Sequence, residues 1–254
     1  FAHVIVDELQ DFSNVELNFI RSLVSEGNND LFMVGDPIQN IYNKKIVFSR
    51  SGINVRGQRS KRLRINYRTT EEIKRLAMSV IQDVEFDDFD GGVEDKAGYL
   101  SLFHGVDPTY QTFNDKQEEL DFVFKEIDAL VNDGVHFNEI VIAARTRDAV
   151  KDFVNKLHQE GMPYVTKNLL NANNDGVRLT TFHGIKGLEF KHVFLVDVNQ
   201  RTLPLLPYNY QGLMGYEKEE IEKRERALFY VASSRAIQRL IITGTGLRSK
   251  LVRV

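Results

Sequence analysis

The sequence predicts an α/β protein made of two lobes, each built around a parallel β-sheet. Short apolar runs of strand length alternate with segments in which apolar residues recur at helical spacing, which is the pattern of parallel strands joined by helices. Several of the apolar runs end abruptly in polar clusters, as is typical where the carboxyl ends of parallel strands form a ligand-binding edge. We therefore expect right-handed crossovers and binding residues at the strand ends.

Composition narrows the classes of function. A chain of 254 residues can bury a full core, and 42% apolar with 27% charged residues is usual for a soluble protein. No apolar run is long enough to cross a bilayer and no signal peptide is visible, so we expect no membrane partner. The absence of cysteine excludes disulfides and thiol chemistry and favours a cytoplasmic location. Because the net charge is -3, any nucleic-acid contact must be confined to a local groove.

The first apolar run, residues 4–6, is predicted to be a buried strand that ends in Asp7 and Glu8. Two carboxylates after such a strand are typical of the Walker-B arrangement, in which the first acid holds hydrated Mg²⁺ and the second polarises a water molecule. The alternative is a solvated turn in which Asp11 or Ser13 caps the following helix.

The rest of the first lobe alternates in the same way. The predicted elements are a helix over 14–26, a strand over 31–34, a strand over 63–66 and a helix from Thr69 or Thr70 to Ile81. The acidic run 85–96 has no apolar periodicity and is predicted to be a linker. This linker places the first lobe at residues 1–90 and the second at 91–254.

The second lobe shows a longer alternation, which predicts a second parallel sheet with helical crossovers. Its strands are predicted at 99–103, 140–144, 163–166, 177–182, 192–196 and 240–243, and its helices at 120–131, 148–159 and 217–236.

Five polar clusters carry the functional signal. In chain order they are Asp-Glu-x-Gln-Asp from Asp7, Gly-Asp-Pro-x-Gln-x-Ile-Tyr from Gly35, Asn-Tyr-Arg from Asn66, Thr-x-His-x-x-Lys-Gly-Leu-Glu-Phe from Thr181, and Tyr-Val-Ala-x-Ser-Arg-Ala from Tyr230. Together they resemble the UvrD/Rep-like family of superfamily 1 DNA helicases, from the Walker-B motif onward and over essentially the whole chain. The resemblance implies two RecA-like lobes of the P-loop NTPase type, the first incomplete, with ATP clamped between them and single-stranded DNA crossing both.

The resemblance also implies a role for each motif residue. Asp7 would hold Mg²⁺, Glu8 would activate the attacking water, Gln39 would sense the γ-phosphate, and Arg68 and Arg235 would bracket it. The ring of Tyr67 would stack on adenine, Glu189 would bind the ribose, and Gly187 belongs to the same nucleotide-binding set. On the DNA side, the implied residues are Tyr42, His183 and Lys186.

Other interpretations of these residues stay open at this point. Arg235 could satisfy the last carbonyls of its helix. His183 could be a packed or capping histidine. Glu225 and Arg226 could form ordinary surface pairs on their helix, and we leave them out of the predicted site.

Two departures from the family pattern bear on the predicted site. No Gly-rich phosphate loop followed by Lys-Ser or Lys-Thr occurs, and the chain begins with Phe1, so we interpret it as a piece of a longer protein that is inactive alone. After Tyr42, where the family usually carries a base-stacking aromatic, this chain has Asn43, Lys44 and Lys45. The two lysines could contact phosphates instead.

The expected function is therefore an ATP-dependent DNA helicase or translocase that uses ATP and Mg²⁺, with the 3′ to 5′ polarity that the family implies. Expected partners are single-stranded DNA or single/double-strand junctions, with further proteins in a repair, recombination or defence complex, at the nucleoid. The alternative is a non-catalytic module that binds nucleic acid or a partner protein.

Overall fold

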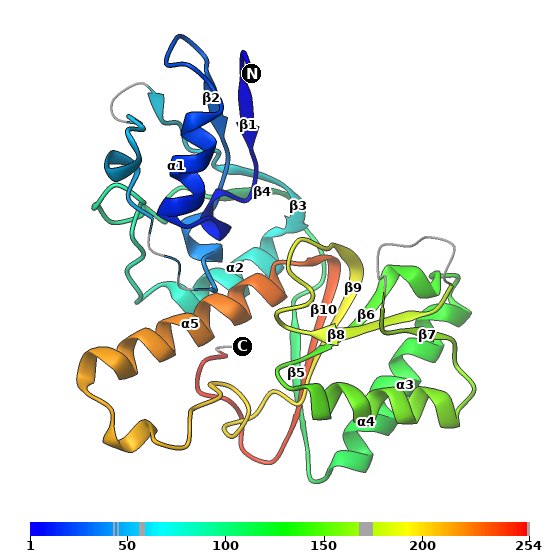
Figure 1. Ribbon diagram of the computed structural model, residues 1–254. Helices are drawn as coiled ribbons and strands as arrows, with labels where there is room; N and C mark the ends of the chain where they lie inside the picture. Colours follow the sequence, from blue (N-terminus) through cyan, green and yellow to red (C-terminus); the bar gives the residue numbers. More distant parts are fainter. Residues whose placement is uncertain (43, 45, 56–58, 168–174, 253–254) are drawn as a thin grey trace. The chain divides into compact units, whose positions relative to one another are not determined.

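The computed structural model describes residues 1–42, 44, 46–55, 59–167 and 175–252 (Figure 1). The chain divides into two compact units. Unit 1 consists of Phe1–Arg64 and Asp83–Tyr99, and unit 2 consists of Ile65–Gln82 and Leu100–Val254. Both units contain parallel strands connected by helices, which confirms the predicted α/β class. Within the described residues, no helix is long and apolar enough to cross a membrane.

Unit 1 contains a two-stranded parallel sheet and one helix. Strands β1 (Val4–Val6) and β2 (Leu31–Met33) pair in parallel, and α1 (Asn14–Ser22) connects them. Ser13 and Glu16 form a reciprocal capping box at the start of α1, so the helix cap offered as an alternative is present.

Helix α1 is shorter than predicted, because it ends at Ser22 rather than at residue 26. The guanidinium of Arg21 donates to the carbonyl of Val24 at 2.7 Å and to Asp30 Oδ2 at 2.7 Å. The side chain of Arg21 therefore supplies the hydrogen bond to the Val24 carbonyl that a further helical turn would otherwise supply.

The segment 83–99 is a folded part of unit 1, so the linker prediction is wrong. Phe89 is buried and packs edge-on against Phe48, with ring centroids 5.9 Å apart. Arg62 makes two hydrogen bonds to the carboxylate of Glu94, at 3.1 and 3.2 Å. Two aromatic residues of this segment, Phe86 and Phe89, belong to the core. They could not be recognised from the sequence, because they stand among acidic residues and show no strand or helix periodicity.

Unit 2 is built on a six-stranded sheet in which every neighbouring pair is parallel, which confirms the predicted second parallel sheet. The strand order is β5-β10-β9-β6-β8-β7. The strands are β5 (Thr109–Phe113), β6 (Ile140–Ala144), β7 (Tyr164–Val165), β8 (Val177–Thr181), β9 (Phe190–Val196) and β10 (Ala236–Thr245). Strand β5 was not predicted, because this edge strand has the mostly polar sequence Thr-Tyr-Gln-Thr-Phe.

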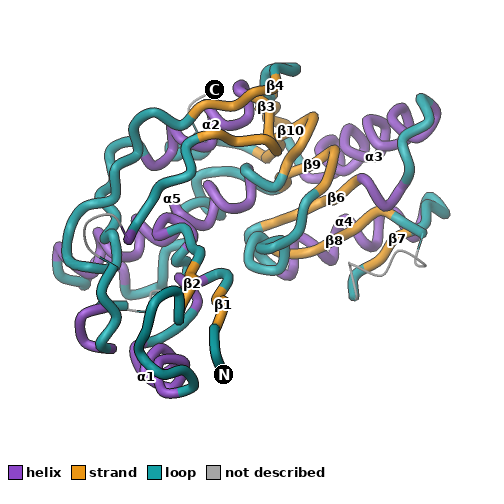
Figure 2. The backbone as a smooth tube through the Cα atoms, turned by 90° about the horizontal axis from the view of Figure 1, so that it is seen from above, coloured by secondary structure: helices purple, strands orange, loops and turns teal. Residues whose placement is uncertain are grey.

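Helices cover both faces of this sheet. α3 (Lys116–Asn132) and α4 (Arg147–Gln159) share one apolar core with β6, β8 and β9. α5 (Gly215–Ser233) contacts β9 and β10, and Figures 1 and 2 show it on the opposite side of these strands from α3. α5 ends three residues earlier than predicted, so Arg235 lies in the short connection to β10.

A second parallel pair in unit 2 consists of β3 (Ile65–Thr70) and β4 (Leu100–Phe103). Strand β3 is longer than predicted and contains Tyr67 and Arg68. Helix α2 (Glu71–Ile81) follows and packs against α5, where Arg226 Nη1 donates to the carbonyl of Val80 at 2.8 Å. These contacts place Ile65–Gln82 in unit 2, which differs from a lobe boundary near residue 90.

Candidate functional site

The predicted acids of unit 1 lie directly after β1. Asp7 is exposed, and its Oδ1 accepts a hydrogen bond from the backbone amide of Glu8 at 2.8 Å. Glu8 has a φ of +50°, a left-handed conformation that is uncommon for residues other than glycine. Such conformations cost free energy and cluster at functional sites. The turn thus directs two successive carboxylates away from the strand.

A polar network joins the carboxyl ends of β1 and β2. Gln10 is 1% exposed; its Nε2 contacts Glu8 Oε2, and its Oε1 accepts from the amide of Asp36 at 3.0 Å. Asp36 Oδ2 in turn accepts from Gln39 Nε2 at 3.0 Å. The structure therefore links the predicted residues Glu8 and Gln39 through Gln10 and Asp36, two motif residues that were not assigned to the site.

Gly35 makes this network possible. A Cβ atom at residue 35 would lie 2.7 Å from Leu9 Cβ and 2.8 Å from Gln10 Oε1. Only glycine therefore allows the end of β2 to approach the turn after β1 so closely.

The donor set of unit 1 fits a magnesium ion that is held mainly by a nucleotide. Among the described residues, no group of three or more His, Cys, Asp or Glu could hold a metal alone. Magnesium in nucleotide hydrolases is usually held by one or two carboxylates, together with water and phosphate oxygens. The exposed carboxylate of Asp7 at a strand end matches that requirement.

Two of the predicted nucleotide-binding residues, Arg68 and Glu189, meet in unit 2, and the backbone of a third, Arg235, lies beside them. Arg68 Nη2 of β3 forms an ion pair with Glu189 Oε1, which lies directly before β9, and both side chains are partly exposed. The amide of Phe190 donates to the carbonyl of Arg235 at 3.1 Å. Residues far apart in the sequence are therefore neighbours at the start of β9 and β10.

The side chain of Arg235 is turned back onto its own helix. It is 3% exposed; its Nε donates to the carbonyl of Val231 at 3.0 Å, and its Nη2 donates to Ser234 Oγ at 3.2 Å. In this conformation Arg235 binds the last turn of α5, as the alternative interpretation expects.

Two more predicted nucleotide-binding residues lie in unit 2. Tyr67 on β3 is 66% exposed, so its ring is accessible to a ligand. Gly187 has a φ of +76° in the turn before Glu189, where a Cβ atom would meet no atom within 4 Å. Its conformation, rather than crowding, favours glycine at this position.

The predicted DNA-side residues of unit 2 lie in the loop that follows β8. The amide of Phe182 donates to the carbonyl of Ala144 at 2.9 Å, and Ile185 is fully buried, so the loop is anchored on both sides of His183. Burial lowers the pKa of His183, and the positive charge of Arg145 lowers it further. The imidazole therefore favours its neutral form.

The predicted DNA-side residues of unit 1 lie after the second polar cluster. Tyr42 is about half exposed, whereas Asn43 and Lys45 lie outside the described residues. The ammonium group of Lys44, expected to contact phosphates, donates to the carbonyl of Asp11 at 2.5 Å and to Glu16 Oε2 at 3.2 Å. Lys44 therefore stabilises unit 1 itself.

The buried ion pair between Arg145 and Glu225 is not predicted by the sequence. The alternative of a surface pair on the helix does not hold for Glu225, because its side chain is 1% exposed and binds the guanidinium of Arg145 through two hydrogen bonds, at 2.9 and 2.7 Å. A sequence signal existed, because Arg145 directly follows a buried apolar strand, as Asp7 does. The partner of Arg145 lies on a distant helix and had no such signal.

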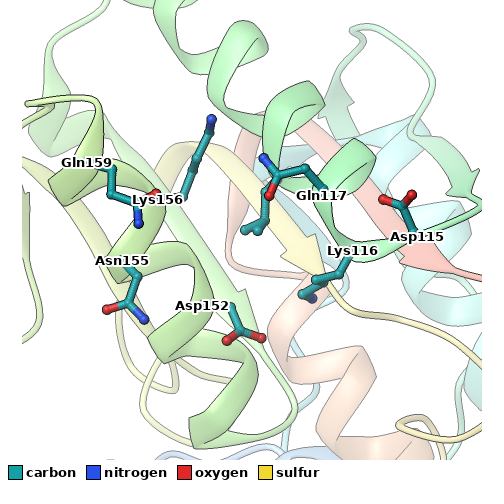
Figure 3. A pocket seen from close by; sticks show the side chains of 8 residues that line it. Asp115, Lys116, Gln117, Asp152, Asn155, Lys156 and Gln159 are labelled. Carbon is teal, nitrogen blue, oxygen red and sulfur yellow. The ribbon is translucent and has the colours of Figure 1, made fainter.

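A surface pocket between α3 and α4 holds none of the predicted residues (Figure 3). Its two lysines already form ion pairs, Lys116 with Glu119 at 2.9 Å and Lys156 with Asp121 at 2.6 Å. We therefore place no function there.

Parallel sheets joined by helices, with polar residues directly after β1 and β2, define an α/β fold of the kind that often binds ligands at its strand ends. Comparison with protein families then identifies the family. The model of the UvrD-like helicase C-terminal domain matches residues 61–171 and 166–246, and that of the UvrD/REP helicase N-terminal domain matches residues 1–45. The chain belongs to the UvrD-like helicase family, which confirms the resemblance inferred from the motifs.

Individual relatives agree with this assignment. A "Probable DNA helicase" of Mycoplasma pneumoniae is 24% identical over 97% of this chain and 44% of that protein. "ATP-dependent DNA helicase UvrD1" of Mycobacterium tuberculosis is 29% identical over 65% of this chain and 22% of that protein. "ATP-dependent DNA helicase srs2" of Schizosaccharomyces pombe is 27% identical over 64% of this chain and 18% of that protein. The chain spans less than half the length of these relatives.

A solved structure shows the same fold. The C-terminal domain of a possible DNA helicase from Lactobacillus plantarum aligns with a TM-score of 0.52 and 19% identity, over 73% of this chain and 91% of that one.

Proposed function

We propose that the chain is part of an ATP-dependent DNA helicase or translocase that moves along single-stranded DNA, with 3′ to 5′ polarity. The observation that carries this proposal is the ion pair of Arg68 with Glu189, next to which Phe190 binds the backbone carbonyl of Arg235. Three motifs that the family uses for a nucleotide are thereby neighbours in space. Two of the relatives are named as ATP-dependent DNA helicases, which supports the same reaction.

In this proposal the residues of unit 1 prepare hydrolysis of the γ-phosphate. Asp7 would hold Mg²⁺, which neutralises phosphate charge when it is bound. The carboxylate of Glu8 would accept a proton from the attacking water, and Gln39 would orient that water. The hydrogen-bond network through Gln10 and Asp36 holds both side chains in position.

The residues of unit 2 would bind the nucleotide and the DNA. The exposed ring of Tyr67 would stack on adenine, and Gly187 and Glu189 would contact the nucleotide beside it. The planar guanidiniums of Arg68 and Arg235 suit a phosphate, because each can donate two parallel hydrogen bonds.

Single-stranded DNA, alone or at a junction with a duplex, is the proposed substrate. Tyr42, His183 and Lys186 would contact it, mostly at phosphates and without sequence preference. A repair, recombination or defence complex remains the proposed setting.

The substitution Glu8→Gln in the full-length protein tests the proposal. Glutamine keeps an oxygen that can accept from Gln10 but cannot accept a proton from water, so DNA-stimulated ATP turnover should fall by about 10² to 10⁴-fold while ATP affinity stays unchanged. Glu26→Gln, an exposed glutamate of the same unit, is the matched control and should behave as wild type. Equal loss of affinity and turnover would make Glu8 a structural residue. A wild-type protein that binds DNA without hydrolysing ATP would favour the non-catalytic module.

A further inference from the structure

A buried ion pair in unit 2 joins the residue that follows β6 to the middle of α5. Arg145, directly after β6, donates through Nε and Nη2 to both carboxylate oxygens of Glu225 in the middle of α5. The amide of Leu205 donates to the same carboxylate at 2.9 Å. The side chain of Glu225, which is almost completely buried, therefore joins α5 to two other segments.

The loop that follows β8 lies beside this pair. β6 and β8 are neighbouring parallel strands, with Ala144 opposite Thr181, so Arg145 and His183 leave the sheet at the same edge. The amide of Phe182 donates to the carbonyl of Ala144 at 2.9 Å, so the loop begins beside the residue that precedes Arg145. The ion pair and the DNA-side loop are thus direct neighbours.

Helix α5 also holds this loop through an aromatic contact. Phe229 lies one helical turn after Glu225, and its ring packs against Phe182 with centroids 6.2 Å apart. Residues four apart lie on the same face of a helix, so α5 presents Glu225 and Phe229 together to the end of β6 and the start of the loop. Gly184 fits tightly here, since a Cβ atom would lie 2.2 Å from Thr180 Oγ1.

We propose that the Arg145–Glu225 ion pair is a positioning device that fixes α5 against the loop 182–188 and so holds His183 and Lys186 in their DNA-contacting arrangement. The effect on DNA rests on the proposed function, whereas the effect on the loop does not. A buried ion pair often adds little net stability, because the desolvation of both charges offsets their attraction. Its geometry, with two parallel hydrogen bonds, is instead well suited to fixing orientation.

The experiment removes both charges together, so that no unpaired charge is left inside the protein. In the double variant Arg145→Met/Glu225→Gln, glutamine keeps an oxygen that can accept from the Leu205 amide, and the net charge is unchanged. The control is Arg239→Met/Glu126→Gln, which removes a more exposed ion pair of 2.8 Å between β10 and α3 that does not involve α5. A third variant, Arg145→Lys, keeps the charge but loses the planar fork.

Three quantities are measured on the full-length variants: the melting temperature, amide hydrogen exchange of residues 182–188, and the Kd for fluorescein-labelled oligodeoxythymidine. We expect the first double variant to melt as the control does, to exchange faster in the loop, and to bind DNA about tenfold more weakly, a loss of about 1.4 kcal/mol. Arg145→Lys should show the same changes in smaller measure.

Loop exchange and DNA affinity equal to those of the control, in both Arg145 variants, would overturn the inference. If the double variant fails to fold, Arg145→Lys decides by the same criterion. A wild-type protein that does not bind oligodeoxythymidine would refute the proposed function. Hydrogen exchange needs no DNA, so the exchange of the loop would still decide whether the ion pair positions it.

Discussion

Replacement of Arg235 separates a role in catalysis from a role in stability. The structure supports the role in stability, because the guanidinium donates to the carbonyl of Val231 and to Ser234 Oγ while it is almost completely buried. The role in catalysis is the one proposed from its motif. Hydrogen bonds that involve a charged group contribute about 1.5–3 kcal/mol each, so Arg235→Ala should lower the free energy of unfolding by about 3 kcal/mol. For a unit of this size, that loss corresponds to a fall in melting temperature of about 6–12 °C.

A loss of about 3 kcal/mol leaves a typical protein folded at 25 °C, since native stabilities are about 5–15 kcal/mol. Turnover at 25 °C therefore reports chemistry rather than unfolding. If Arg235 reaches the γ-phosphate as an arginine finger, turnover of the full-length Arg235→Ala protein should fall by about 10³ to 10⁵-fold, with little change in ATP affinity. Arg235→Lys should recover little of this activity, because an ammonium group cannot reproduce the planar fork.

The assay measures DNA-stimulated phosphate release, ATP affinity and melting temperature for both variants. Arg248→Ala is the control, because its guanidinium also donates to a backbone carbonyl, that of Tyr110 at 2.9 Å, but belongs to none of the motifs. Lower melting with near-normal turnover in either Arg235 variant would refute the finger and leave only the helix-end role.

Three further outcomes are expected. Gly244→Ala should destabilise the protein by about 1–3 kcal/mol in urea unfolding, because a Cβ atom would lie 2.0 Å from the carbonyl oxygen of Val198. Gly212→Ala is the control and should be near neutral, because a Cβ atom there would meet nothing within 4 Å. Equal effects of the two substitutions would contradict the argument. Burial, and next the charge of Arg239, lower the pKa of His192 from 6.5, so its contribution to stability is present above pH 6.5 and is lost as pH falls through the lowered folded-state pKa. His192→Leu should flatten the pH dependence of unfolding in that range, and an unchanged slope would exclude His192 as its source. Binding to single-stranded DNA should be weak, independent of sequence and steeply weakened by salt, and Lys186→Ala should reduce the slope of log K against log salt by about 1; salt-insensitive or sequence-specific binding would favour the non-catalytic module.

Elements with a strong local signal were predicted well. The continuous apolar runs of β6 and β9 indicated buried parallel strands. This prediction did not require the register between the strands. Helices α3 and α4 were recognised from their apolar stripes, although each begins before the first apolar residue of its stripe. Errors occurred where the local signal was mixed, as in the polar edge strand β5 and the acidic segment 83–99.

The motif residues show the same division. Asp7 and Glu8 follow a strand, and sequence alone placed them at its carboxyl end. Sequence did not show that Gln10 reaches the amide of Asp36, or that Lys44 binds Asp11 and Glu16 within unit 1. The Gln10 contact depends on how closely the two strand ends approach, which Gly35 permits.

By itself, the sequence determined the α/β class, the parallel second sheet, the order of the motifs and the family. These properties are encoded in residues close together along the chain, where hydrophobic periodicity and turn chemistry act. Only the tertiary structure decided that Arg68 meets Glu189 and that Arg145 meets Glu225. A charged residue carries no local mark of its partner, because the partner is selected by strand register and helix packing between segments far apart in the chain.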